Sequence, residues 1–170
     1  MSRHKAYIAV GSNIGNRLMH LQEAVEMLEK LTGTTVNAVS AVYMTEPVGD
    51  TDQERFFNGV VLLETVLEPE ALRQSCKTIE RDLGRPEAYR RWSPRVIDLD
   101  ILLFDNLCIR SETLCIPHPE MHNRKFVLVP LLDISNPLHP SSGETASGLL
   151  RKCSDRSVLV KLKETLAMKQ

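Results

Sequence analysis

The sequence has almost no net charge. Its 21 Lys and Arg residues against 22 Asp and Glu residues leave a formal charge of −1 over 170 residues. Without a strong overall field, the molecule is not drawn as a whole to a nucleic acid or an anionic membrane. Five arginines nevertheless lie between Arg81 and Arg95. In a neutral chain, such a local cluster suits a small anion better than a polymer.

Cysteine and long hydrophobic runs are scarce as well. The four cysteines form no Cys-x-x-Cys pair and are too sparse for a disulfide framework, which indicates reduced thiols. The first apolar stretch, residues 6–10, ends at Gly11 and is too short for the core of a signal peptide or for a membrane span. We therefore expect a soluble, cytoplasmic protein.

The chain also lacks internal repeats, low-complexity tracts and linker-like stretches. At 170 residues with 42% hydrophobic content, it is long enough to bury a sizeable core. We expect a single domain over residues 1–170, in which the tail after about residue 140 carries the weakest structural signals.

Periodicity and turn residues predict the order β-α-β-β-α-β followed by a hairpin. Strands are expected at residues 6–10, 36–44, 60–66 and 96–104, helices at 18–28 and 69–83, and a further short helix at 126–134. Asn16 is suited to cap the first helix and Pro69 to open the second. The turn residues 105–106 predict a hairpin through residues 107–109. This ferredoxin-like order implies an α+β fold, a two-layer α/β sandwich with the helices on one face of an antiparallel sheet.

The most informative feature is a pair of carboxylates inside an apolar, β-branched segment. Asp98 and Asp100 are two residues apart, and side chains in a strand alternate between faces, so both carboxylates should point to the same side. Adjacent buried carboxylates repel each other. A hard divalent cation, most naturally Mg²⁺, removes that repulsion because it takes oxygen ligands and shares them with substrate phosphates. The pair therefore predicts a metal site.

Cationic and aromatic residues lie directly upstream of the carboxylates. Arg90, Arg91 and Arg95 suit bidentate recognition of phosphate, and Trp92 offers a flat stacking surface. Each part alone has an ordinary explanation: Asp-x-Asp is usually a turn, an arginine cluster a solvated face and a tryptophan a core residue. The apolar run 101–104 favours a strand that enters a core, and the adjacency of the parts favours a nucleotide-phosphate site.

The run over residues 91–101 resembles the signature of a known family. It reads Arg-Trp-Ser-Pro-Arg-Val-Ile-Asp-Leu-Asp-Ile, and the 6-hydroxymethyl-7,8-dihydropterin pyrophosphokinases of folate biosynthesis carry Arg-Trp-Gly-Pro-Arg-x-x-Asp-Leu-Asp-Ile. The resemblance continues in order over roughly residues 6 to 135. It includes residues 9–13, 45–47, Asp52, Gln53, Phe56, Asn58, Glu80, Gly84, Arg85, 117–119, Met121, Arg124 and Phe126.

The resemblance implies a reaction that fits the residues. The family transfers a pyrophosphoryl group from ATP to the hydroxymethyl group of the pterin and releases AMP. Asp98 and Asp100 would hold two Mg²⁺ ions that bridge the triphosphate. The residues implied in catalysis are Arg91, Arg95, Asp98 and Asp100.

The resemblance also divides further residues between two substrates. It implies ATP contacts from Lys77, Arg85, Trp92, Arg95, Ile101, His118 and Arg124. It implies pterin contacts from Thr45, Pro47, Val48, Phe56, Asn58, Trp92 and Phe126, with the two phenylalanines stacking on the ring. The expected partners are therefore small molecules rather than nucleic acid or membrane, and the chain is expected to act as a monomer.

Some positions depart from the family pattern, and two other functions stay open. Ser93 stands where glycine is usual, and Lys77, Glu87 and Pro119 differ from some members, which affects the expected nucleotide contacts. A ferredoxin-like binding or regulatory module would hold a structural or sensing cation without turnover. A two-metal nuclease or nucleotidyl transferase should carry a basic surface, which the charge count does not support.

Overall fold

An antiparallel sheet built around β1 (His4–Ser12) and β4 (Phe56–Thr65) organises the molecule. The computed structural model describes residues 1–45, 52–85 and 94–169. Within these residues the strand order is β5-β1-β4-β3-β8, and β2 also pairs with β4. β2 (Thr34–Val39) and β3 (Tyr43–Thr45) pair with successive stretches of β4, so they share one position beside it. With β5 (Asp98–Phe104) on the far side of β1, the order is ferredoxin-like, which confirms the α+β prediction.

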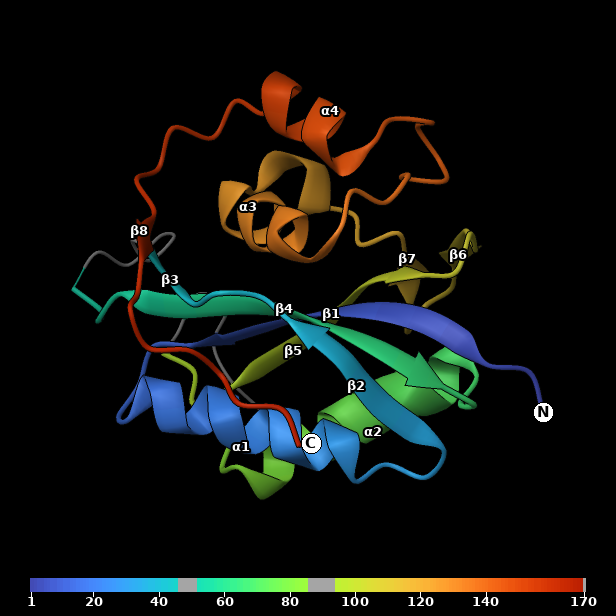
Figure 1. Ribbon diagram of the computed structural model, residues 1–170, viewed down its shortest axis with the longest axis horizontal. Coiled ribbons are helices and arrows are strands. Elements are labelled where there is room, and N and C mark those ends of the chain that lie inside the picture. The colour runs from blue at the N-terminus through green and yellow to red at the C-terminus, as the bar shows by residue number, and fades with distance from the viewer. Residues whose placement is uncertain (46–51, 86–93, 170) are drawn as a thin grey trace.

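Two helices cover one face of the sheet (Figure 1). α1 (Arg17–Glu29) begins where the Asn16 side chain accepts a hydrogen bond from the N–H of Met19, and α2 (Pro69–Asp82) begins with its proline. Both starts follow the prediction, because a side-chain acceptor and a proline each suit the first helical turn. The apolar sides of these helices pack on alternate residues of β1 and β5 to form the larger core cluster.

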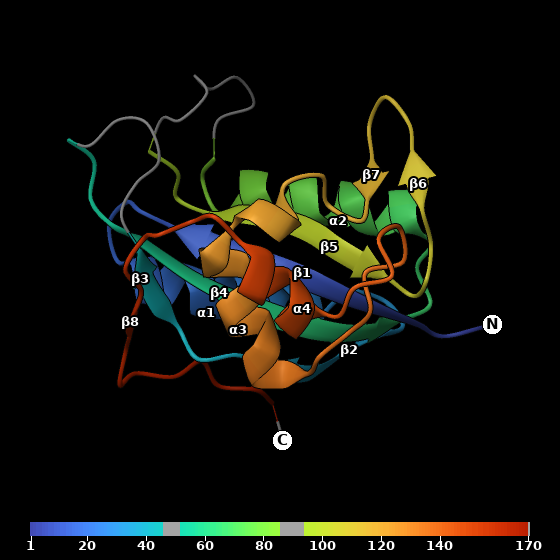
Figure 2. The ribbon, with the colours of Figure 1, turned by 90° about the horizontal axis from the view of Figure 1, so that it is seen from above.

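A third layer lies on the opposite face, which the two-layer prediction did not include. α3 (Lys125–Ile134) and α4 (Ala146–Lys152) lie above the sheet in Figure 1 and in front of it in Figure 2, and the 3-10 turn η1 (Met121–Asn123) precedes α3. They bury a second apolar cluster against the other side of the same strands. The two-layer description therefore holds only for the ferredoxin-like core. No helix among the described residues is both long and apolar enough to cross a bilayer.

Two local predictions also need correction. The single strand expected over residues 36–44 is interrupted between β2 and β3, where Ser40 Oγ accepts a hydrogen bond from the N–H of Val60. The hairpin after β5 exists, but its strands are β6 (Ile109–Arg110) and β7 (Cys115–Ile116), which pair with each other. The turn at residues 105–106 therefore does not pair the following residues with β5. It leads to a separate two-stranded sheet.

The C-terminal segment runs from α4 along the edge of the sheet and onto α1 (Figure 1). Its strand β8 (Val160–Lys161) pairs with β3. Further on, Leu166 is buried in the larger core cluster. Gln22 of α1 then exchanges two hydrogen bonds with the backbone of Ala167, at 3.0 and 2.7 Å. The tail is thus attached to the fold along its length.

Candidate active site

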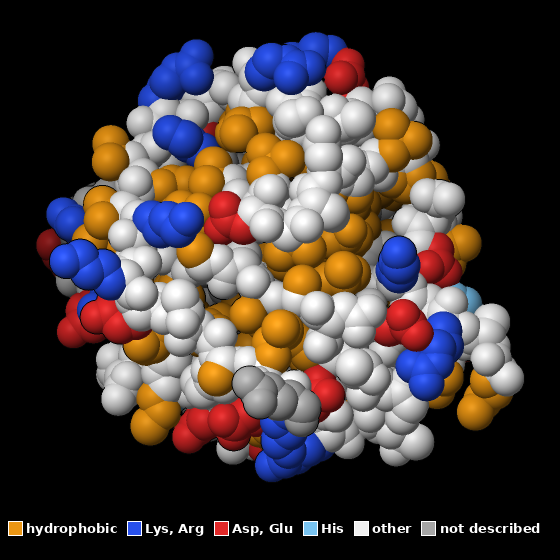
Figure 3. Space-filling view, in the orientation of Figure 1, with side chains coloured by type: hydrophobic (Ala, Val, Ile, Leu, Met, Phe, Trp, Pro, Cys, Tyr) orange, Lys and Arg blue, Asp and Glu red, His pale blue; other side chains and the backbone are white. Residues whose placement is uncertain are grey.

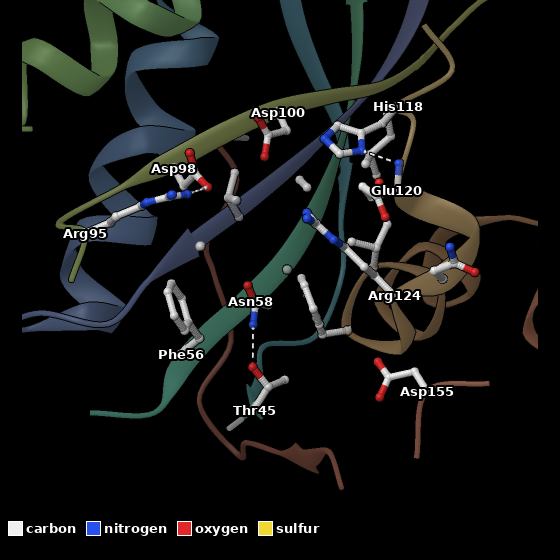
Figure 4. A pocket seen from close by; sticks show the side chains of 18 residues that line it. Thr45, Phe56, Asn58, Arg95, Asp98, Asp100, His118, Glu120, Arg124 and Asp155 are labelled. Atoms are coloured by element: carbon white, nitrogen blue, oxygen red, sulfur yellow. Dashed lines mark hydrogen bonds and ion pairs between the residues drawn. The ribbon is translucent and has the colours of Figure 1, made fainter. Parts of the chain in front are cut away.

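A cavity of about 490 Å³ lies between the sheet and α3. Its floor consists of parts of β1, β4 and β5, and η1 and the start of α3 form another wall (Figure 4). The cavity brings together nine residues that the sequence predicted for the site: Thr45, Phe56, Asn58, Arg95, Asp98, Asp100, His118, Arg124 and Phe126. Residues separated by up to 81 positions along the chain therefore meet in one place.

Asp98 and Asp100 both line this cavity, as strand alternation predicted. The residue between them, Leu99, and its neighbours Ile97 and Ile101 are buried on the other face of β5, in the core shared with α1 and α2. The apolar face of the strand thus fixes the direction of the two carboxylates. Sliding the strand by one residue would bury both charges in that core.

The two carboxylates have different surroundings. Asp98 accepts hydrogen bonds from Arg95 at 2.8 Å and from Arg85 at 2.6 Å, each to a different oxygen. Asp100 has no hydrogen-bond donor among the described residues. Burial, followed by repulsion from Asp98, raises the pKa of Asp100 to about 7. A carboxylate that is costly to ionise and faces a cavity is suited to receive a cation.

The buried acid Glu80 binds Arg85, one of the two arginines that contact Asp98. Its carboxylate accepts hydrogen bonds from Lys77 Nζ at 3.1 Å, from Arg85 Nη1 and from the N–H of Leu99 at 3.4 Å. Burial raises the pKa of Glu80, while Lys77 and Arg85 oppose that change. Glu80 therefore holds Arg85 next to Asp98 and connects α2 to β5.

No role for Glu80 was predicted from the sequence, although a signal was present. Glu80 lies four residues after Cys76, on the apolar stripe of α2, so a charged side chain occupies a core position. Such an acid needs buried partners. Which cations supply them depends on how α2 packs against β5, and that packing is a tertiary feature.

Asn13 is a second residue whose role the sequence did not show. It is buried, its Oδ1 accepts the N–H of Arg95 at 2.7 Å, and its own N–H donates to the Arg95 carbonyl at 3.0 Å. Its side-chain amide also donates to Gln53 and to the carbonyl of Glu54. Asn13 thus fixes the backbone of Arg95 just before β5.

His118 and Arg124 supply the opposite wall of the carboxylate end. The N–H of His118 donates to the carbonyl of Leu102 at 2.9 Å, which places the imidazole beside β5. The Nδ1 atom accepts the N–H of Glu120 at 3.1 Å, so in the neutral ring the proton is on Nε2. Burial, followed by the charge of Arg124, lowers the pKa of His118 to about 4. His118 is therefore a neutral hydrogen-bond donor at pH 7.

Aromatic and amide groups lie at the other end of the cavity. Asn58 is buried and donates to Thr45 Oγ1 at 2.8 Å, which connects β4 to β3 (Figure 4). Phe56 comes from the start of β4 and Phe126 from the first turn of α3. Both rings line the cavity, which makes this end suitable for a flat heterocycle with a polar edge.

The remaining predicted residues are placed as follows. Arg85 is buried behind Asp98, and Lys77 is half-exposed on α2, where it binds Glu80. The side chain of Ile101 does not reach the cavity, because it packs in the core on the other face of β5. The predicted contacts that lie outside the described residues are Pro47, Val48, Arg91 and Trp92.

The donor set of the carboxylate end fits Mg²⁺. Among the described residues, no group of three or more His, Cys, Asp or Glu side chains converges as a complete metal cage. Two carboxylates that face a cavity leave the other positions of a hard cation open to water and to substrate oxygens. The donorless, partly buried Asp100 is the observation that supports this fit.

Comparison with known proteins shows the family of the chain. The family model described as 7,8-dihydro-6-hydroxymethylpterin-pyrophosphokinase (HPPK) matches residues 7–136. The 2-amino-4-hydroxy-6-hydroxymethyldihydropteridine pyrophosphokinase of Bacillus subtilis is 48% identical over 129 residues, which are 76% of this chain and 77% of that protein. The protein of the same name from Methylorubrum extorquens is 45% identical over 148 residues, which are 87% of this chain and 92% of that protein.

Solved structures show the same fold. The wild-type HPPK-DHPS of Plasmodium falciparum, crystallised with pteroate, superposes with a TM-score of 0.72 at 18% sequence identity. The superposition covers 89% of this chain but only 44% of that longer protein. Since the family model spans more than half of the residues, and both relatives are more than 40% identical over most of their length, the chain belongs to the 7,8-dihydro-6-hydroxymethylpterin-pyrophosphokinase family.

Proposed function

We propose that the cavity is the active site in which the chain transfers a pyrophosphoryl group from ATP to 6-hydroxymethyl-7,8-dihydropterin. The reaction releases AMP and belongs to folate biosynthesis. The observation that carries this proposal is the division of one cavity into two ends. Carboxylates with arginines lie at one end, and two phenylalanines with a buried amide lie at the other. A triphosphate and a pterin need these two environments side by side.

Asp98 and Asp100 are the residues suited to hold Mg²⁺, and we propose two ions. When bound, Mg²⁺ screens the charge of the triphosphate and polarises its phosphoryl oxygens. The strand keeps the two carboxylates on one face, so they approach the phosphates from the same side. Arg85 and Arg95 already contact Asp98, and their guanidinium groups therefore lie within reach of an anion that binds there.

Three cavity residues are suited to stabilise charge on the phosphates. Arg95 and Arg124 carry fixed positive charge. The family resemblance also implies Arg91, which lies outside the described residues. His118 contributes a hydrogen bond from Nε2 without adding charge. Such preorganised donors act most strongly where charge develops in the transition state. The residues proposed to bind the phosphates are thus suited to the charge that develops at the reacting centre.

The transfer itself needs positioning more than a strong base. The pterin hydroxymethyl oxygen attacks the β-phosphorus, the bond from that phosphorus to the α-β bridging oxygen breaks, and the hydroxyl proton is lost. Charge accumulates on oxygens next to cations, so alignment and electrostatic stabilisation supply most of the acceleration. We assign no general base.

The aromatic end is suited to hold the pterin. Phe56 and Phe126 would stack on its ring, and Asn58 would bind its polar edge, with Thr45 holding the amide in place. Lys77 and Ile101 are weaker nucleotide contacts in this scheme. Lys77 is bound to Glu80, and the side chain of Ile101 packs in the core on the other face of β5. We also propose that the enzyme acts as a cytoplasmic monomer.

The decisive assay measures pterin-dependent AMP release from ATP in the presence of Mg²⁺. The proposal predicts stoichiometric AMP and pterin pyrophosphate, with no ADP. Binding of pterin and ATP without turnover would instead support a binding module. Pyrophosphate release in the presence of a polynucleotide would support a nucleotidyl transferase. On the face shown in Figure 3, positive and negative side chains are interspersed, without the continuous basic surface that such an enzyme uses.

A further inference from the structure

Asp155 lines the cavity although it lies in the C-terminal segment, beyond the residues 7–136 that the family model matches. Figure 4 shows its side chain below Arg124, on a segment that is separate from β4, β5 and α3. The tail therefore contributes directly to the wall of the active site. The mechanism described above uses no residue of this segment, so the role of Asp155 needs its own explanation.

Asp155 contacts the first residue of α3 and, within its own segment, Ser157. Its Oδ2 accepts the N–H of Lys125 at 3.0 Å, and its Oδ1 accepts the N–H of Ser157 at 2.9 Å. The Lys125 ammonium donates in return to the carbonyl of Ser157 at 3.1 Å. Two hydrogen bonds thus join the start of α3 to residues 155–157, and the third closes a turn within that segment. We call this group, formed by Lys125, Asp155 and Ser157, the α3 clasp.

The start of α3 has no cap of its own. Arg124 occupies the N-cap position without a side-chain hydrogen bond, and the first turn contains no acidic residue. A helix start leaves backbone N–H groups unsatisfied and carries partial positive charge, so a carboxylate there is stabilising. Burial acts to raise the pKa of Asp155, but the N–H groups of Ser157 and Lys125 outweigh it, and the pKa is lowered. Asp155 therefore supplies the missing cap from 30 residues further along the chain.

The capped turn is the part of α3 that faces the cavity. Phe126 follows Lys125 directly, and Arg124 precedes it, so the clasp holds the residue between two cavity side chains. If the cap is lost, the first turn frays, and Phe126 no longer has a fixed position for stacking. The carboxylates on β5 do not depend on this turn, because their positions are set by the strand.

We propose that Asp155 is a positioning residue for the pterin: through the α3 clasp it fixes the first turn of α3 and thereby the stacking position of Phe126. The inference rests on the proposed function of the cavity. It gives the C-terminal segment a part in substrate binding in addition to its contacts with β3 and α1. It also predicts that damage at Asp155 affects the pterin more than the nucleotide.

The test compares Asp155→Ala, Asp155→Asn and the control Gln22→Ala in the full-length chain. Gln22 attaches the same tail to α1, away from the cavity, so its variant reports the effect of loosening the tail alone. Calorimetry gives the dissociation constants of the pterin and of MgATP, steady-state assays give kcat and KM, and thermal melting verifies folding.

We expect Asp155→Ala to weaken pterin binding by about fivefold to tenfold. MgATP binding should change less than pterin binding, because the carboxylates on β5 do not depend on this turn although Arg124 adjoins it, and kcat at saturating pterin should be nearly retained. Asp155→Asn keeps an acceptor oxygen at a cap and should recover part of the affinity. Gln22→Ala should bind the pterin like the wild type.

Equal pterin affinity in the wild type and a folded Asp155→Ala would overturn the inference, as would an equal loss in Gln22→Ala. If Asp155→Ala does not fold, Asp155→Asn provides the same comparison, and unchanged affinity in that variant would also overturn it. Wild-type protein that binds no pterin would contradict the proposed function itself. The two failures are therefore distinguishable.

Discussion

Asp98 and Asp100 are both aspartates on the same face of one strand, yet their neighbours give them different properties. Asp98 is neutralised by Arg85 and Arg95, whereas Asp100 faces the cavity with a pKa raised to about 7 by burial and by Asp98. One carboxylate thus has its counter-charge within the protein, and the other still needs one. This asymmetry is the residue-scale reason to place a cation beside Asp100.

The pKa of His118 can be measured directly and reports the electrostatics of the site. Its pKa is lowered from 6.5 to about 4 by burial and by Arg124, so the folded protein binds fewer protons than the unfolded chain in that interval. The contribution of His118 to stability is therefore complete above pH 6.5 and is lost as the pH falls toward 4. NMR of the imidazole should show a neutral ring with the proton on Nε2 down to about pH 5.

Two results would contradict this assignment. One is a His118 resonance that titrates near pH 6.5 in the folded protein, and the other is a proton on Nδ1 at pH 7. His118→Gln identifies the resonance. Between pH 7 and pH 4 this variant should also lose less unfolding free energy than the wild type.

Arg95 should act on the reaction more than on nucleotide binding. A guanidinium that contacts a reacting phosphate gains strength as charge develops, so Arg95→Ala should lower kcat by about a hundredfold or more while MgATP affinity changes little. Arg95→Lys should recover little activity because the bidentate fork is lost. Steady-state kinetics with binding titrations measure the split, and the exposed Arg110→Ala is the charge-matched control. A weaker affinity with unchanged kcat would make Arg95 a docking residue only.

At this scale, strand periodicity was enough to predict that Asp98 and Asp100 point the same way. It could not show Glu80, Asn13 or Asp155 as partners of the site. Each of these residues joins segments that are separate in the sequence. Glu80 holds Arg85 against β5, Asn13 holds the backbone of Arg95, and Asp155 caps α3. Such contacts depend on tertiary packing, which local patterns do not encode.

At the scale of elements, the pairing of β1 with β4 sets the shape of the aromatic end of the cavity, which we propose binds the pterin. Gly11 lies opposite Asn58 in the register of these strands. A Cβ atom at Gly11 would lie only 2.8 Å from Asn58 Oδ1, so the glycine leaves the space that the amide occupies. The absence of a side chain at Gly11 on β1 thus leaves room for the Asn58 amide on β4.

Gly11→Ala should therefore disturb Asn58 and weaken pterin binding. We expect a loss of about tenfold, similar to that of Asn58→Ala, with MgATP affinity unchanged. Calorimetry on a double-mutant cycle checks the route of the effect. In the Asn58→Ala background, Gly11→Ala should cost nothing further, because the clashing group is gone. Additive losses would show that Gly11 acts in another way.

Turn and helix signals located most elements, but not the third layer. Asn16 and Pro69 marked the starts of α1 and α2 because capping chemistry is local. The helix expected at residues 126–134 also forms, as α3. Its position on the opposite face of the sheet was not predictable, since an apolar helix does not specify which face it covers. The interruption between β2 and β3 depends similarly on a cross-strand bond from Val60 to Ser40.

At the scale of the whole molecule, the two faces of the sheet have different tasks. The face covered by α1 and α2 holds the larger apolar core, and this core anchors the strands that carry the site. The opposite face is only partly covered by α3 and α4, and the cavity lies between this layer and the sheet. The C-terminal segment joins the two faces by passing along β3 to α1.

The most direct test of the account is pterin-dependent AMP release by Asp98→Asn and Asp100→Asn at saturating Mg²⁺. Both changes keep the shape of the side chain but remove a metal ligand. We predict that each lowers turnover by about a thousandfold or more, while pterin binding and the thermal midpoint stay close to those of the wild type. Glu112→Gln, at an exposed position between β6 and β7, is the matched control and should be fully active. Near-wild-type turnover in either Asp variant would contradict the assignment of this cavity as the site of pyrophosphoryl transfer.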